Sequence, residues 1–562
     1  MKTRISHGLL LMFILNILFG TRTSSSCDTW IAMKRATKDG RIIFTKNSDR
    51  TVFDSQPLLL YGRKKWDDHA MIDLGRLSIP QVPETYAVIG SSPYWCWGFE
   101  EGMNEFGVTI GNEGIMTKSL QEEIRRKNMG EMQPYGPTGM DILRLALERS
   151  KTAAEAVQVI GYMTETYGQF GSGLPATDLK GAYHNSYMVA DPVEAWIVET
   201  TGKHWVARHV TEDVASISNT FSITDRWDLA SEGLIRNAVR RGWWDKSSDK
   251  FDFSDVYSDD QPVYLALQRR AGIRANCSLG LLHQKAPDID ESWMMRIARD
   301  RSTTPGLDLD VTASSCIAVL PGNDDELPVF WWAASVPGIS CYIPYFVQSG
   351  KLPSVVSKAG TRGKTVTPPR KVAMDQFSED SFWWLFRDLA DKANLNWDER
   401  HKLIRSEFDL LEHEFMAEAK TVSKKAALLI NSGSEAEASG ILSSFTEKCL
   451  NKVIKKLNEL RLLFENEVPD IDVSEFKDYI GTYEIRKGLN FDISLVGEQL
   501  FARLTGQPAF EVYPVYKDRF EFRVAKAAIK FVRNSKDEVT TLLLFQGGKE
   551  IPAKRVPSGP GK

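Results

Sequence analysis

Cys27 directly follows a segment that has the pattern of a secretory leader. This segment, residues 1–26, begins with basic side chains and continues with an apolar core, residues 9–19, that is too short to span a membrane. Ser24 and Ser26 are small residues at the positions that signal peptidases prefer. The pattern therefore predicts a cleaved signal peptide, export to a secreted, periplasmic or lumenal location, and a folded chain that begins with cysteine.

A cysteine at the first position of a chain carries a thiol nucleophile and a free α-amine on one residue. The amine has a reference pKa of about 7.7–8.0, so it can take the thiol proton near neutral pH. In one alternative interpretation, signal peptidase cleaves the chain a few residues before Cys27. In another, Cys27 carries a lipid anchor, although lipoprotein signals usually have Leu where this chain has Ser24. Acylation of the α-amine would also remove the proposed base.

Composition and motif content narrow the remaining classes of protein. The net charge of −4 gives no reason to expect a nucleic acid partner, and no later apolar run is long enough to form a transmembrane segment. The six cysteines are scattered without metal-ligand spacing, and export permits disulfides among them without indicating a pairing. The chain has no HExxH, GxSxG or P-loop motif. We therefore expect neither a metal nor an organic cofactor.

Residues 27–372 have the pattern of an α/β domain, because short apolar runs alternate with Gly, Asn and Asp. A helix is expected near residues 138–149. A second helix opens at Thr152 with a capping box, and Gly168 is a plausible stop. The expected buried strands are residues 30–33, 41–44, 107–110, 187–190, 195–198, 214–217 and 329–334.

The C-terminal third of the chain changes character twice. Residues 373–468 carry apolar stripes at helical spacing and are expected to form a helical extension. Residues 469–562 contain closely spaced strand patterns separated by turn residues, which predicts a small antiparallel barrel or sandwich. This part resembles the small β-domain appended to some secreted hydrolases and peptidases.

A charged cluster follows the first expected hairpin. If residues 30–33 and 41–45 pair, the segment from Lys46 to Arg50 returns toward Cys27. Asp49 would then orient the α-ammonium, and Lys46 or Arg50 would lower the pKa of the thiol. The alternative interpretation is an ordinary charged turn after a hairpin.

Several long motifs occur in the order found in a known family. The chain resembles the secernin and dipeptidase D family of N-terminal-nucleophile cysteine hydrolases from Cys27 to about residue 345, and more loosely to about residue 467. The resemblance implies an α+β fold, an αββα sandwich with Cys27 at the edge of the central sheets, and amide hydrolysis. The motifs that carry it are residues 27–30, 46–50, 97–113, 139–149 and 167–169.

The same resemblance implies roles for residues around Cys27. Asp49 matches the acidic residue of related penicillin V acylases and bile salt hydrolases, whereas Lys46 stands where those relatives usually have Arg. The Lys ammonium is a compact point charge, whereas the Arg guanidinium can donate two parallel hydrogen bonds to one carboxylate. Asn112 and Asn219 are placed near the nucleophile, where their amides would donate to an oxyanion. The related acylases also have an arginine further along the sequence. The candidates for this residue in the present chain are Arg269, Arg270 and Arg274.

Three function hypotheses follow. The first is a secreted dipeptidase, in which Glu113 or Asp225 holds the ammonium of a short peptide substrate and Lys46 or Arg226 holds its carboxylate. The second is an acylase-type amidase that acts on N-acyl substrates. The third is a lipid-anchored binding protein, attached at Cys27, that has lost catalysis. The sequence leaves open the side-chain preference, the oligomeric state and the role of the β-domain.

Overall fold

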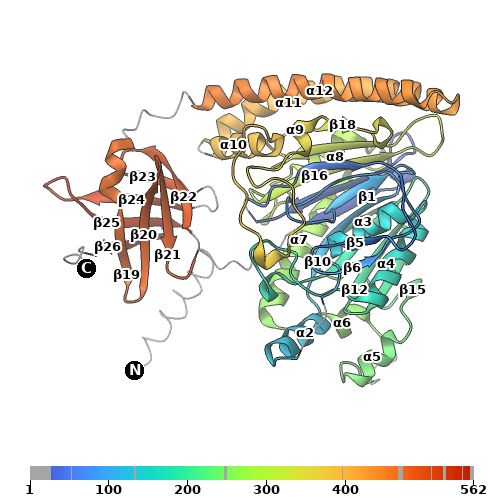
Figure 1. Ribbon diagram of the computed structural model, residues 1–562, viewed down its shortest axis with the longest axis horizontal. Helices are drawn as coiled ribbons and strands as arrows, with labels where there is room; N and C mark the ends of the chain where they lie inside the picture. Colours follow the sequence, from blue (N-terminus) through green and yellow to red (C-terminus); the bar gives the residue numbers. More distant parts are fainter. Residues whose placement is uncertain are drawn as a thin grey trace. The chain divides into compact units, whose positions relative to one another are not determined.

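The computed structural model is divided into two compact units, which Figure 1 shows as ribbons. One unit contains the chain from Cys27 to residue 458, apart from residues 391–396, and the other contains the C-terminal β-domain. The predicted leader, residues 1–26, and the C-terminal tail, residues 557–562, lie outside the described residues. The structure describes residues 27–51, 53–131, 135–245, 250–394, 396–465, 473–507, 509–522, 527–546 and 549–556.

The first sheet of the larger unit has six antiparallel strands in the order β14-β1-β2-β16-β17-β18. Every residue of β1, β2 and β16 is buried, because both faces of the sheet are covered. These strands are therefore interior strands. The bounds are β1 (Asp28–Ala32), β2 (Ile42–Asp49), β14 (Val214–Ser218), β16 (Thr312–Leu320), β17 (Val329–Ala334) and β18 (Ile343–Tyr345).

The second sheet has eight strands in the order β15-β13-β12-β11-β10-β9-β8-β3. It packs against the first sheet, and β10 lies over β1. Its strands are β3 (Leu58–Tyr61), β8 (Val88–Ser91), β9 (Glu101–Asn104), β10 (Thr109–Ile115), β11 (His184–Ala190), β12 (Ala195–Thr201), β13 (His204–His209) and β15 (Leu229–Ala230). Two small ribbons, β4–β7 and β5–β6, are formed by Lys64–Lys65 with Glu84–Thr85 and by Met71–Asp73 with Ser78–Pro80.

Helices cover the outer face of each sheet. α3 (Gly139–Arg149) and α4 (Ala153–Tyr167) pack on the second sheet, and α7 (Pro262–Lys285) and α8 (Glu291–Ala298) pack on the first. Thr152 caps α4 and Gly168 ends it at a φ of 73°, as predicted. The capping box expected at Thr152 is incomplete, because Glu155 accepts from the Lys151 amide, whereas Thr138 and Asp141 form a complete box at α3. The layers run helix, sheet, sheet, helix, which confirms the predicted αββα sandwich. Shorter helices are α2 (Lys118–Asn128), α5 (Leu234–Arg240), α6 (Phe253–Tyr257) and α9 (Ser354–Ser357).

The predicted helical extension is also confirmed. It consists of α10 (Phe382–Asn394), α11 (Trp397–Asn431) and α12 (Glu435–Glu465). α11 and α12 run antiparallel, because three lysines of α12 pair in reverse order with glutamates of α11. Of the described helices, none is long and apolar enough to cross a membrane.

The C-terminal β-domain is a closed barrel of eight antiparallel strands in sequential order. Phe476, Tyr479 and Phe531 are among the side chains that fill its interior. The sequence predicted six of the strands but not β19 and β26, whose pairing closes the barrel. The strands are β19 (Gly481–Arg486), β20 (Leu489–Val496), β21 (Gln499–Leu504), β22 (Ala509–Tyr516), β23 (Arg519–Phe522), β24 (Ala527–Arg533), β25 (Val539–Gln546) and β26 (Lys549–Arg555).

Candidate active site

Cys27 directly precedes β1, which lies between β14 and β2. Asp28 is opposite Ser218 on one side and Asn47 on the other. Cys27 is only 1% exposed, and its thiol donates to the backbone carbonyl of Asp49 over 3.8 Å. The first hairpin therefore returns its polar end to Cys27, as the sequence predicted.

The polar segment from Lys46 to Asp49 is the end of β2, although the sequence suggested that it follows the strand. It stays extended because β16 pairs with β2 as far as Asp49, which lies opposite Thr312. The expected strand, residues 41–44, was too short because polar residues rarely continue a buried strand. The pairing places four polar side chains in the middle of the first sheet.

Alternate side chains of β1 and β2 point to opposite faces of the sheet. Thr29 and Lys46 are direct partners and point toward the second sheet, where Thr29 donates to Glu113 over 2.5 Å. Cys27 precedes Thr29 by two residues and therefore starts the same row. The space between the two sheets thus contains a polar layer that begins at the thiol.

Lys46 is fully buried in this layer and is surrounded by acceptors. Its ammonium donates to the backbone carbonyl of Asn112 and lies 3.5 Å from Glu113 and 3.9 Å from Glu100. Burial opposes its charge, but Cys27 and the two glutamates outweigh that effect and raise the pKa of Lys46. Lys46 is therefore a stable buried cation beside the thiol.

Burial raises the pKa of the Cys27 thiol, and Lys46 acts against this by favouring the thiolate. The nearby carboxylates of Glu100, Asp49 and Glu113 raise the thiol pKa further. Burial also raises the pKa of Glu113 to about 7, in opposition to Lys46. All six cysteines are free thiols, and the Cys27 carbonyl additionally accepts a hydrogen bond from the buried Arg274.

The opposite face of the first sheet carries a second set of charges, centred on Arg274 of α7. Arg274 donates to Asp28 over 2.8 Å, to the Cys27 carbonyl over 3.4 Å and to Ser218 over 2.8 Å. Of the three arginines that the sequence proposed, Arg269 and Arg270 are exposed and Arg274 is 3% exposed. The structure explains the difference, because Arg274 lies on the buried face of α7 together with Ala271, Ser278 and Leu282.

Asp49 lies on this same side, where its Oδ1 accepts a hydrogen bond of 2.6 Å from Thr312. Its Oδ2 is buried and has no partner among the described residues. Burial, together with the negative charge of Asp28, raises the pKa of Asp49 to about 8, against the opposing effects of Thr312 and Arg274. The carboxylate is thus held by one oxygen beside the start of β1.

Asn112 lies within β10, whereas the sequence suggested that it follows the strand. β10 continues to Ile115 because β11 pairs with it throughout. The Asn112 amide donates to Asn185 over 2.8 Å, on the face of β10 opposite to Glu113. Its backbone carbonyl accepts from Lys46. Asn112 is thereby tied to the site through its backbone, and its oxyanion role stays a prediction.

Asn219 follows β14, as expected, directly after Ser218, which is opposite Asp28. Its amide nitrogen donates to the Gly114 carbonyl over 2.9 Å, and its oxygen accepts from Arg274 over 2.7 Å. The half-buried side chain therefore spans the two sheets beside the thiol.

Two charged residues of the site had no assigned role in the sequence, namely Glu100 and Asp54. Arg50 is fully buried and pairs with both, and its guanidinium also donates to the Gly173 carbonyl over 2.7 Å. The motif that contains Glu100 was visible in the sequence, but its pairing with Arg50 across two sheets was not. In contrast, Asp225 and Arg226 are exposed, and Asp225 lies 3.3 Å from Lys250.

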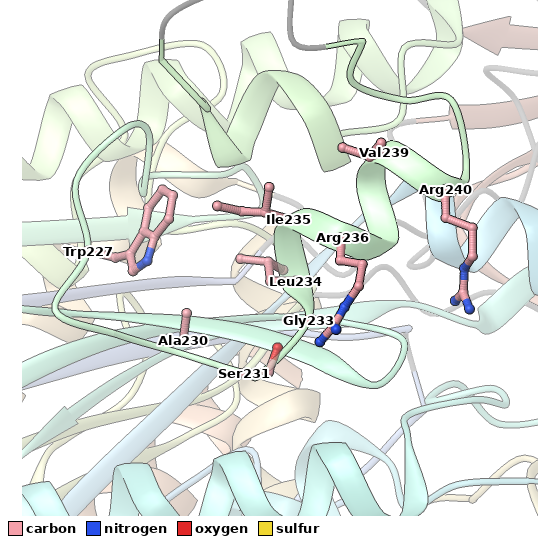
Figure 2. A pocket seen from close by; sticks show the side chains of 9 residues that line it. All are labelled: Trp227, Ala230, Ser231, Gly233, Leu234, Ile235, Arg236, Val239 and Arg240. Carbon is pink, nitrogen blue, oxygen red and sulfur yellow. The ribbon is translucent and has the colours of Figure 1, made fainter.

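A surface pocket of about 670 Å³ lies beside α5, as Figure 2 shows. Trp227 and Ile235 contribute apolar walls, and Arg236 and Arg240 contribute guanidinium groups. No residue that the sequence proposed for the site lines this pocket. The candidate active site is therefore the buried cluster around Cys27.

The larger unit is an αββα sandwich, and its Cys27 thiol directly precedes a central strand of the first sheet. Residues 26–264 match a family described as Peptidase family C69. This match confirms the resemblance to a dipeptidase family that the sequence indicated. Residues 465–555, which include the barrel, match a family described as a domain of unknown function, DUF3471.

Curated relatives of the chain include a probable dipeptidase A from Streptococcus pyogenes serotype M18 (strain MGAS8232). It is 25% identical over 197 residues, which are 34% of this chain and 38% of that protein. The probable dipeptidase A of serotype M1 matches with the same identity and coverage. The match thus spans less than two fifths of these relatives.

Two solved structures match part of this chain. A mutant of the conjugated bile acid hydrolase from Clostridium perfringens has a TM-score of 0.31 and 13% identity, and the match covers 55% of this chain and 89% of that one. An N-acylethanolamine-hydrolyzing acid amidase ortholog from Caenorhabditis elegans has a TM-score of 0.27 and 14% identity, with coverages of 53% and 94%.

Proposed function

We propose that this protein is a secreted dipeptidase that hydrolyses short peptides with Cys27 as an N-terminal nucleophile. The observation that carries the proposal is the position of Cys27, at the start of a central strand and beside the buried cation Lys46. The match to Peptidase family C69 supports peptide bonds as the target.

Removal of residues 1–26 would free the Cys27 α-amine, which then takes the thiol proton, directly or through a water molecule. The thiolate attacks the carbonyl carbon of the peptide bond, and the carbonyl electrons move to the oxygen. As the tetrahedral intermediate collapses, the C–N bond breaks and the ammonium of Cys27 gives its proton to the leaving amine. Water then hydrolyses the thioester and restores the thiol.

In this scheme Asp49 orients the ammonium of Cys27. Its Oδ2 is the buried carboxylate oxygen that has no partner among the described residues, while Thr312 holds Oδ1. An ammonium brought to Oδ2 would remove the cost of leaving a buried carboxylate oxygen without a hydrogen bond. The same contact would keep the amine beside the thiol.

The oxyanion of the intermediate needs hydrogen-bond donors. Asn219 is the better-placed candidate, since it accepts from Arg274, which also donates to the Cys27 carbonyl. The Asn112 amide donates to Asn185 on the face of β10 opposite to Glu113, so a contribution from it would require this side chain to turn toward the polar layer. Lys46 stabilises the thiolate by its charge.

The test is turnover of a dipeptide panel by the purified mature protein and by Cys27→Ala and Cys27→Ser variants. Loss of at least about a thousandfold in kcat/KM is expected for Cys27→Ala, because the covalent step is lost. Cys277→Ala is the matched control, since Cys277 is half-buried on α7 and has no part in the scheme. Wild-type turnover by Cys27→Ala would refute the proposal.

A further inference from the structure

The polar layer beside Cys27 contains more carboxylates than cations. Glu100, Glu101 and Glu113 are buried there, whereas Lys46 and Arg50 are the cations that pair with members of this layer. Arg50 is also paired with Asp54, which is itself buried. A buried carboxylate is costly unless it is paired, so this layer is suited to receive one more positive charge.

Lys46 is not available as a receptor for a substrate carboxylate. Its ammonium is already bracketed by Glu100 and Glu113 and donates to a backbone carbonyl. A substrate carboxylate beside it would also meet two negative charges. The layer therefore favours a cationic group of the substrate.

Both Glu101 and Glu113 have a vacant acceptor for such a group, and Glu113 is the one bound to Thr29 of β1, two residues after Cys27. Its Oε1 accepts from Thr29 and faces Lys46, while its Oε2 is buried and has no hydrogen-bond partner among the described residues. Glu113 is 0% exposed, and the bond from Thr29 fixes its orientation. Buried carboxylate oxygens normally accept at least one hydrogen bond, so we expect Oε2 of Glu113 to accept one from a bound group.

The separation between Cys27 and Glu113 matches the dimensions of a peptide. Cys27 precedes Thr29 by two residues on one face of β1, so the thiol lies about 7 Å along the strand from the hydroxyl that Glu113 binds. In an attacked peptide, sulfur and carbonyl carbon are about 3 Å apart. The α-nitrogen lies about 2.5 Å beyond this carbon, and a charged hydrogen bond adds about 2.8 Å. The α-ammonium therefore reaches the region of Glu113.

We propose that Glu113, held by Thr29 and Lys46, is the receptor for the α-ammonium of the substrate, so that the enzyme selects peptides with a free N-terminus. The proposal rests on the proposed function of Cys27 as the nucleophile. An N-acylated peptide lacks the positive charge and leaves Glu113 without its partner. The site thus favours the dipeptidase over the acylase-type amidase.

The first test compares a dipeptide with its N-acetyl derivative and its desamino analogue on the wild-type protein. Loss of a charged hydrogen bond is expected to lower kcat/KM by about 10–100-fold for both modified substrates. Equal turnover of all three substrates would overturn the receptor role and leave the nucleophile intact. Absence of any turnover that depends on Cys27 would instead refute the proposed function.

The second test uses Glu113→Gln, which keeps the size of the side chain and the acceptor for Thr29. We expect KM for the dipeptide to rise about 10–100-fold, while kcat/KM for the N-acetyl derivative changes much less. Glu101→Gln is the matched control, because Glu101 is a buried glutamate of the same layer whose Oε1 is held by Ser91 and Ser314 and whose Oε2, like that of Glu113, has no partner among the described residues. The Glu101→Gln variant is expected to prefer the dipeptide over its N-acetyl derivative by the same factor as the wild type.

Thermal unfolding shows whether Glu113→Gln is folded, and Glu113→Asp provides a second variant that keeps the charge. Partial recovery of the preference in Glu113→Asp supports a charge receptor. An unchanged preference in a folded Glu113→Gln protein would show that Glu113 only stabilises the layer between the sheets, and would overturn the proposal.

Discussion

Thr29 donates a hydrogen bond of 2.5 Å to Glu113 and thereby joins a central strand of one sheet to a central strand of the other. Since Cys27 begins the same strand as Thr29, this contact fixes the thiol relative to the buried charges of the second sheet. The consequence is a nucleophile whose electrostatic surroundings are set by the packing of two sheets. The predictions below test separate parts of this arrangement.

Lys46→Met is expected to make the Cys27 thiol less acidic. Lys46 is a buried cation that favours the thiolate, so its removal raises the pKa of Cys27. A rise of one pKa unit lowers the thiolate population about tenfold at neutral pH. The rate of alkylation by iodoacetamide, followed as a function of pH, measures this effect. Lys65→Met, which changes an exposed lysine, is the control, and identical alkylation profiles for the two variants would contradict the assignment.

Gly111→Ala is expected to destabilise the protein and to displace Lys46. A Cβ at Gly111 would lie 2.7 Å from Cδ of Lys46 and 3.0 Å from the Thr29 hydroxyl, where no space remains. Overpacking of this kind costs about 1–3 kcal/mol. Urea unfolding measures the cost. Gly272→Ala on α7 is the matched control, because its Cβ would meet no atom within 4 Å and helix propensity favours alanine. Equal stabilities of the two variants would show that the sheets are more loosely packed than described.

Arg274→Met is expected to destabilise the protein by about 3–5 kcal/mol, because it leaves Asp28 buried without its cation. The double variant Arg274→Met with Asp28→Asn removes the uncompensated charge as well. Its stability is therefore expected to lie closer to that of the wild type, which a double-mutant cycle of unfolding free energies measures. Additive effects of the two substitutions would argue against a direct pair.

Glu199 is expected to make stability depend on pH. Burial raises the pKa of Glu199 to about 7, although the Ser222 amide and hydroxyl donate to it. The folded state then keeps the proton to a higher pH than the unfolded state does. Stability contributed by this proton is present below the unfolded pKa of about 4.3 and is lost as pH rises toward 7.

Glu199→Gln removes this titration. The melting temperature of the variant relative to the wild type is therefore expected to rise between pH 5 and pH 8. Asn219 precedes the loop that Glu199 binds, so kcat/KM at pH 5 checks that the loop position is retained. If the difference in melting temperature between the variant and the wild type does not vary with pH, Glu199 is not the cause of the pH dependence of stability.

Local patterns were sufficient to predict much of the larger unit. Turn residues and apolar periodicity gave the two helices on the second sheet, and the first hairpin correctly brought Asp49 to Cys27. The same signals placed the ends of β2 and β10 too early, because a polar run inside a fully paired strand looks like a turn. The barrel was expected from its turns, but its closure depends on β26 pairing with β19 over a long separation.

Contacts between distant segments could not be read from the sequence. The pairing of Arg274 with Asp28 joins residues 246 positions apart, and three arginines on one segment were equally plausible candidates. Lys46 lies 3.9 Å from Glu100 and 3.5 Å from Glu113 because the two sheets are stacked with a particular alignment of their strands. Of the two roles that the sequence proposed for Lys46, this alignment favours the partner of the thiolate over the receptor for a carboxylate.

The central claim is that the free α-amine of Cys27 is the catalytic base. The most direct measurement compares two forms of the otherwise identical protein, one that begins at Cys27 and one that carries a single additional glycine before it. Intact mass confirms each N-terminus, and the hydrolysis rate of one dipeptide is measured for both. The account predicts turnover only from the form that begins at Cys27, with a loss of at least about a hundredfold in the extended form. Equal turnover, or a secreted protein whose Cys27 amine is acylated yet fully active, would contradict it.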